Sequence, residues 1–206
     1  MRVLAIVASP RRNGLVSTMV QRVLDGAADS EHQVELVNLY DCKLNYCLGC
    51  WACAEKGYCV QKDDFGTILE KVKAADVLVL AAPVYWSNVP GIMKTFFDRH
   101  CGLAWDWSRR RKFPVVSFEW PPLRQELTGK RAVLIMVCTA PFPPFFDRLL
   151  MIHEISDAMR AMVNYTRKME MKIVARLVFH NTLNPKFIGK HKERFLANAY
   201  RIGRQL

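Results

Sequence analysis

Residues 2–14 read Arg-Val-Leu-Ala-Ile-Val-Ala-Ser-Pro-Arg-Arg-Asn-Gly, and this stretch decides the fold class. Its apolar part, residues 2–8, is rich in β-branched side chains and stops at a Ser-Pro pair, which is typical of a strand buried on both faces. Residues 15–28 then place apolar side chains at helical spacing. A buried strand, a short polar loop and a helix together begin an alternating α/β pattern.

The same alternation continues to the end of the chain. Strands are predicted at residues 33–39, 76–82, 132–138 and 172–179, and helices at about 64–74, 91–100, 145–169 and 188–205. Such alternation implies a parallel sheet with helices on both faces, and five strands suit the order 2-1-3-4-5. Ligands of these sheets bind at the carboxyl ends of the strands. We therefore expect the loops 9–14, 83–90 and 139–144 to converge.

Length and composition favour one domain over residues 1–206. The chain has 206 residues, of which 51% are hydrophobic, enough to bury a core without disulfides. Residues 101–130 are too long for a plain connection and are expected to form an insertion near the site. No apolar run approaches the ~20 residues of a membrane span, and no signal peptide is visible, so a cytoplasmic location is expected.

The net charge of +11 is concentrated near the C-terminus. Residues 160–206 hold 11 of the 30 Lys and Arg residues but only two acidic ones, Glu170 and Glu193. A basic C-terminal helix could meet nucleic acid, an anionic membrane surface or an acidic partner. We favour a solvated helix face over any of these.

The loop after the first strand is a candidate phosphate site. It offers hydrogen-bond donors from Ser9, Arg11, Arg12 and Asn13. Gly14 lets the backbone approach closely, at the start of a helix whose free N–H groups favour an anion. The loop has neither the Gly-x-Gly-x-x-Gly dinucleotide pattern nor a Walker motif, so a monophosphate is expected. The alternative is an ordinary polar loop that caps a helix.

The loop after the third strand is a candidate ring site. It reads Pro83-Val84-Tyr85-Trp86-Ser87-Asn88-Val89-Pro90-Gly91. Two aromatic side chains, several polar groups and backbone N–H groups could hold a planar heterocycle, and two prolines stiffen the loop. The alternative is a rigid turn with packed aromatic side chains.

Four of the seven cysteines, Cys47, Cys50, Cys53 and Cys59, fall within 13 residues. In a reducing compartment such crowding favours metal or redox chemistry over structural disulfides. Thiolates suit iron–sulfur clusters or zinc. Zinc ribbons more often use two separated pairs, so the compact spacing favours a 4Fe–4S cluster, with zinc, free thiols or a disulfide as alternatives. Two further cysteines, Cys101 and Cys138, are expected to be small buried hydrophobes.

Taken in order, these motifs resemble a known family. The chain carries ASPRRNG at 8–14, C-x2-C-x2-C-x5-C-x3-DD at 47–64, APVYW at 82–86 and G-x2-K-x-F-x-DR at 91–99. This pattern is similar to that of the flavodoxin-like NAD(P)H-dependent FMN reductases, and most closely to their iron–sulfur flavoprotein branch. The resemblance covers about residues 1–100 well and extends loosely over the last two strands.

The resemblance implies a flavodoxin-like three-layer α/β sandwich that binds FMN without a covalent bond. By motif position, the phosphate would be held by Ser9, Arg11, Asn13 and Gly14. The ring would lie along Pro83, Val84, Tyr85, Trp86, Ser87 and Asn88. The family usually has Asn-Thr after the glycine; here Leu15 and Val16 stand there, and Ser17 and Thr18 are expected to substitute. Thr139, in a loop without the usual glycines, would form the third wall.

The implied function is that of an FMN-dependent oxidoreductase with a 4Fe–4S cluster on Cys47, Cys50, Cys53 and Cys59. The electron donor would be NAD(P)H or ferredoxin, and the acceptor a small molecule such as a quinone or a flavin. No side chain is expected to act as a proton-transfer catalyst, because the cofactors supply the chemistry. The resemblance suggests a homodimer or homotetramer. A flavodoxin-like electron carrier without substrate turnover and a thiol-based redox sensor are the alternatives.

Tryptophans flank a basic run in the expected insertion. Trp105, Trp107 and Trp120 surround the basic residues 109–112. Such residues could cover a flavin, stack on a nicotinamide or form a subunit contact. We favour a lid or an interface over binding of single-stranded nucleic acid.

Overall fold

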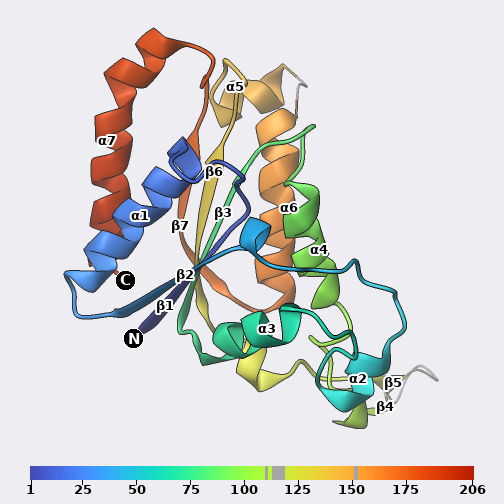
Figure 1. The fold of residues 1–206 in the computed structure, drawn as a ribbon. Coiled ribbons are helices and arrows are strands. Elements are labelled where there is room, and N and C mark those ends of the chain that lie inside the picture. The colour runs from blue at the N-terminus through green and yellow to red at the C-terminus, as the bar shows by residue number, and fades with distance from the viewer. Residues whose placement is uncertain (110, 113–118, 151–152) are drawn as a thin grey trace.

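Five parallel strands form the centre of the molecule, as a computed structural model shows (Figure 1). The structure describes residues 1–109, 111–112, 119–150 and 153–206. The sheet order is β2-β1-β3-β6-β7, which confirms the predicted order 2-1-3-4-5. The strands are β1 (Arg2–Val7), β2 (Gln33–Asn38), β3 (Val77–Pro83), β6 (Arg131–Val137) and β7 (Lys172–Phe179).

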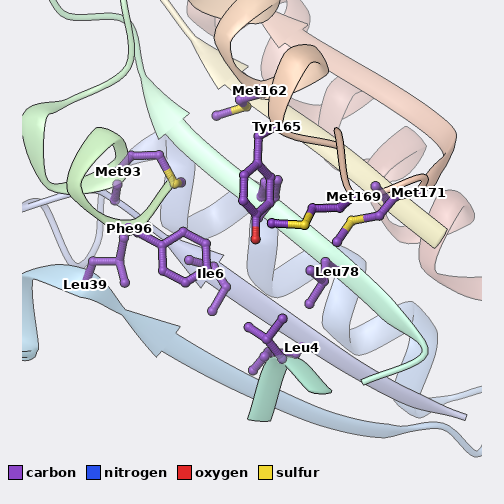
Figure 2. Packing of buried hydrophobic residues seen from close by; sticks show 14 of the residues in the cluster. Leu4, Ile6, Leu39, Leu78, Met93, Phe96, Met162, Tyr165, Met169 and Met171 are labelled. Atoms are coloured by element: carbon purple, nitrogen blue, oxygen red, sulfur yellow. The ribbon is translucent and has the colours of Figure 1, made fainter. Parts of the chain in front are cut away.

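Helices cover both faces of this sheet, because side chains alternate along each strand. Val3, Ala5 and Val7 of β1 pack against α1 (Leu15–Ala28) and α7 (Pro185–Arg204). Leu4 and Ile6 face α3 (Phe65–Ala74), α4 (Gly91–Arg99) and α6 (Glu154–Lys168). Figure 2 shows this second face, where side chains of β1 and β3 meet those of α4 and α6. The layers confirm the three-layer sandwich.

Two glycines allow α1 and α7 to pack closely. A Cβ atom on Gly26 would lie 2.1 Å from the carbonyl oxygen of Tyr200. A Cβ atom on Gly203 would lie 2.0 Å from the carbonyl oxygen of Val23. Real Cβ atoms do not come so close to backbone, so these positions require glycine. The contact holds the basic helix against the first helix.

The prediction of a single helix at 145–169 is wrong, because the structure has two helices there. Helix α5 (Pro144–Leu149) and helix α6 are separate, and residues 151–152 of the predicted helix lie outside the described part. Asp147, which is fully buried, accepts hydrogen bonds from the amides of Ile155 and Ser156 at 3.2 and 3.1 Å. A carboxylate near free N–H groups of a first turn favours a new helix start.

Short elements occupy the remaining connections. They are η1 (Leu39–Asp41), α2 (Ala52–Lys56), η2 (Trp107–Arg109), β4 (Arg111–Lys112), β5 (Glu119–Trp120) and η3 (Gln125–Leu127). Residues 110 and 113–118 of the expected insertion lie outside the described part. Over the residues that are described, no helix combines the length and apolarity that a bilayer crossing requires.

Candidate functional site

A cavity of about 440 Å³ opens at the carboxyl ends of the strands. The loops after β1, β3 and β6 all contribute to its wall, as the topology predicts. Among the predicted cofactor residues, the cavity brings together Ser9, Arg11, Asn13, Gly14, Thr18, Pro83, Val84, Tyr85 and Thr139. Ser17 instead lines a neighbouring groove with Arg12 and Asn13. Trp86, Ser87 and Asn88 do not line the cavity, and Trp86 is fully exposed.

The first turn of α1 forms one end of this cavity. Gly14 is its N-cap and has no side chain that could accept from the first-turn N–H groups. The loop before it is held by a side chain of α1, since the Ser17 hydroxyl donates to the Arg11 carbonyl at 3.0 Å. Ser9 is buried, and its carbonyl accepts a hydrogen bond from the side-chain Nδ2 of Asn38 at 2.9 Å. An uncapped helix start on an ordered polar loop is a favourable anion site.

The two arginines of this loop differ in their surroundings. Arg12 forms an exposed ion pair with Asp41 on η1, away from the cavity. Arg11 lines the cavity wall. Of these two residues, Arg11 is therefore the one that brings its charge to the cavity.

The loop after β3 forms a tight two-residue hairpin. Tyr85 and Asn88 exchange backbone hydrogen bonds of 2.8 and 3.0 Å around Trp86 and Ser87. Both central residues have positive φ angles, 49° and 57°. Turns of this type usually carry Asn-Gly, because other side chains are strained there. The Val84 amide also donates to the Val137 carbonyl at 2.8 Å, so the loop is fixed to the end of β6.

The sequence analysis missed the wall that the last helix contributes. Thr182, Leu183, Ile188 and Lys192 also line the cavity. Helix α7 begins at Pro185, earlier than the predicted 188, because the Asn184 side chain caps it by accepting from the Phe187 amide at 3.1 Å. The Asn-Pro pair is a signal that could have found this start. Helix α7 also brings a cation, Lys192, to the cavity.

A second cavity, of about 270 Å³, is lined by cysteines. Its wall contains the four predicted thiols, Cys47, Cys50, Cys53 and Cys59. Burial and, to a smaller extent, the other three thiols raise the pKa of the Cys53 thiol to about 11. The four sulfurs are therefore close enough to interact electrostatically.

A fifth cysteine lines the same wall. Cys101 is exposed at this cavity, so the prediction of a buried Cys101 is wrong. It lies just beyond the end of α4, where the backbone turns. Cys138 is buried as predicted, with 2% of its surface exposed.

The donor set of the cysteine cavity suits a cluster in its chemistry. Soft thiolates are the ligands of iron–sulfur centres. A Cβ atom on Gly102 would lie 2.6 Å from the Cys53 sulfur, so the glycine leaves room beside that thiol. Within residues 1–109 and the other described segments, no three Cys, His, Asp or Glu side chains already converge as a metal site. The cavity therefore offers suitable ligands without a preformed arrangement of them.

The described part of the insertion packs against the cysteine loop. The rings of Trp51 and Trp107 meet edge to face with centroids 6.2 Å apart. The Arg124 guanidinium donates to the Ala54 carbonyl at 2.7 Å. Neither Trp105 nor Trp107 lines the 440 Å³ cavity, and the side chain of Trp120 is outside the description. These contacts place the described part of the insertion beside the cysteine loop, and its role as a lid or an interface stays a prediction.

The two cavities are separate within one chain. They share no lining residue. Figure 1 shows α2, in the cysteine loop, at the opposite end of the molecule from the first turn of α1.

Comparison with known proteins identifies a family and several relatives of this chain. Residues 1–142 match the family described as NADPH-dependent FMN reductase. An iron–sulfur flavoprotein of Archaeoglobus fulgidus is 42% identical over 99 residues, which cover 48% of this chain and 45% of that protein. One from Methanosarcina thermophila is 33% identical over 117 residues, covering 57% and 59%. The chain thus spans about half the length of the curated relatives that it matches.

A solved structure resembles the whole chain. The NAD(P)H:quinone oxidoreductase from Methanothermobacter marburgensis superposes with a TM-score of 0.75 at 20% identity, covering 99% of this chain and 98% of that one. At this identity the similarity shows a shared fold.

Proposed function

This chain belongs to the NADPH-dependent FMN reductase family, and from that premise we propose that it binds FMN and passes electrons from NAD(P)H or ferredoxin to a small acceptor. The similarity to iron–sulfur flavoproteins confirms the predicted resemblance to the iron–sulfur flavoprotein branch of this family. One observation carries the proposal: the loops after β1, β3 and β6 meet at one cavity beside an uncapped helix start.

The phosphate would be held at the first turn of α1. Arg11 supplies the charge, and Ser9, Asn13 and Thr18 supply polar groups of the same wall. Lys192 adds a second cation from α7. Both charges also favour an anionic, reduced ring over a neutral one.

The ring would lie against the loop after β3 and against Thr139. The tight hydrogen bonds of the Tyr85–Asn88 hairpin keep this wall rigid, so little order has to be gained on binding. FMN supplies hydride and single-electron chemistry when bound. The residues of this chain bind and orient it, and no side chain is assigned a proton-transfer role.

The finer proposal is a 4Fe–4S cluster held by Cys47, Cys50, Cys53 and Cys59. It is supported by four thiols on one cavity wall and by the similarity to iron–sulfur flavoproteins. A cluster would add one-electron chemistry. We also propose a quinone or a free flavin as the acceptor, a homodimer or homotetramer as the assembly, and the cytoplasm as the location.

The test is an anaerobic purification with FMN, iron and sulfide counted per chain. Cys50→Ser should retain FMN and lose iron, whereas Arg11→Gln should retain iron and lose FMN, because the two cavities are separate. The wild type should oxidise NADH or NADPH in the presence of a quinone or free flavin. Cofactor binding without oxidation by any acceptor would favour an electron carrier, and a protein that refuses FMN would refute the proposal.

A further inference from the structure

We propose that Arg99 is a positioning residue of the cysteine site, where it holds both ends of the cysteine loop and donates a hydrogen bond to the Cys59 sulfur. This inference rests on the proposed cluster. Arg99 lies at the end of α4, and the sequence analysis gave it no role beyond its place in the motif at residues 91–99.

Arg99 and Asp63 form a fully buried ion pair. Their side chains are 1% and 0% exposed. Both terminal nitrogens of the guanidinium donate to the carboxylate, with Nη1 to Oδ2 at 2.6 Å and Nη2 to Oδ1 at 2.9 Å. The guanidinium also stacks over the Phe65 ring, 4.5 Å from its centroid. This bidentate geometry fixes the orientation of Arg99.

The same two side chains connect the beginning and the end of the cysteine loop. Arg99 Nη1 donates to the Asn45 carbonyl at 2.8 Å, two residues before the first cysteine. The Asp63 carboxylate accepts from the Asn45 amide at 2.8 Å and from the Phe65 amide at 3.2 Å. The chain segments before Cys47 and after Cys59 are therefore held together by one buried pair.

The second N–H of Nη2 is directed at a sulfur. Nη2 lies 3.3 Å from Cys59 Sγ. A buried ion pair does not by itself stabilise a fold, because its desolvation cost offsets its attraction and apolar residues often do as well. A guanidinium does what an apolar residue cannot: it offers a charged donor to a thiolate. Hydrogen bonds and charge at the sulfurs set the reduction potential of a cluster, and outer partners of metal ligands strengthen binding.

The decisive variant is Arg99→Met with Asp63→Asn. Methionine fills much of the arginine volume, and asparagine is neutral, so no buried charge is left unpaired. Asparagine retains one of the two carboxylate oxygens, and so it keeps an acceptor for either the Asn45 amide or the Phe65 amide. We expect this variant to fold and bind FMN as the wild type does. Its affinity for iron should fall by about 10- to 100-fold, measured as loss of iron to a ferrous chelator. Its reduction potential should shift to more negative values.

Arg124→Met is the matched control. Arg124 also ties down the cysteine loop, through the Ala54 carbonyl, but no hydrogen bond to a thiol is among its described contacts. It should leave the reduction potential unchanged. Arg99→Lys keeps the charge without the fork, and we expect an intermediate potential. Arg99→Lys also replaces the double variant as the test if the double variant does not fold.

Three results would overturn the inference. A cluster that keeps its potential and its iron in the double variant, or in Arg99→Lys when the double variant does not fold, would show that Arg99 has no role at the sulfur. An equal shift in Arg124→Met would show that loop attachment alone matters. A wild type without iron and sulfide would refute the proposed cluster itself, and this inference with it.

Discussion

Acidification to pH 4 should destabilise this fold through His100, which is fully buried at the end of α4. Its Nδ1 donates to the Phe96 carbonyl at 2.8 Å, and its ring lies among Phe65, Phe96 and Tyr165. Nε2 has no hydrogen-bond partner among the described residues. A second proton would therefore create a buried charge. Burial, reinforced by the positive charge of Arg99 and opposed by the Phe96 carbonyl, lowers the pKa of His100 to about 4.

The size of the effect follows from linkage. The ordinary pKa is 6.5, so the unfolded chain takes up its proton at a higher pH than the folded chain. The stabilising contribution is thus complete above pH 6.5 and is lost as pH falls toward 4. At about 1.4 kcal/mol for each pH unit between the two pKa values, the loss is about 3 kcal/mol. That is a large fraction of a typical stability of about 5–15 kcal/mol.

Urea unfolding between pH 7 and pH 4 measures this loss, with His100→Phe as the reference. Phenylalanine keeps the aromatic packing and cannot titrate, so its free energy of unfolding should depend much less on pH. Hydrogen bonds from Arg99 and two amides outweigh burial and lower the pKa of Asp63, so that carboxyl titrates below this window. Parallel pH profiles for the two proteins would refute the reasoning.

Three further predictions concern the cavity and the helix packing. Lys192→Met should weaken FMN about 10- to 100-fold, as loss of a hydrogen bond to a charged group implies, while riboflavin, which lacks the phosphate, should bind equally in a fluorescence titration; equal losses for both would contradict a phosphate role. Ser87→Gly should raise the melting temperature by about 2–4 °C, because glycine accepts the positive φ without strain, and an unchanged or lower melting temperature would count against this. Gly203→Ala should destabilise by about 1–3 kcal/mol in urea, because its Cβ would meet the Val23 carbonyl. Gly189→Ala, in an open part of the same helix, should not lower the free energy of unfolding. Equal losses of stability in Gly203→Ala and Gly189→Ala would refute the packing argument.

Local sequence patterns were enough to predict the sheet and the position of the ligand loops. The apolar run at residues 2–8, the repeated strand–helix alternation and the Ser9–Gly14 loop are local patterns, each readable within about a dozen residues. Side-chain periodicity decides strand against helix, and alternation decides a parallel sheet. The flavodoxin-like order and the convergence of three loops follow from these patterns without knowledge of any distant contact.

Contacts between separate elements decided the rest, and most of these contacts join residues far apart in the chain. Asp147 divides the helix predicted at 145–169 only because its buried carboxylate reaches the amides of a later turn. Lys192 belongs to the cavity wall because α7 packs beside α1. Arg99 meets Cys59 across 40 residues of sequence. Such contacts depend on where whole elements pack, and periodicity within one element carries no information about that.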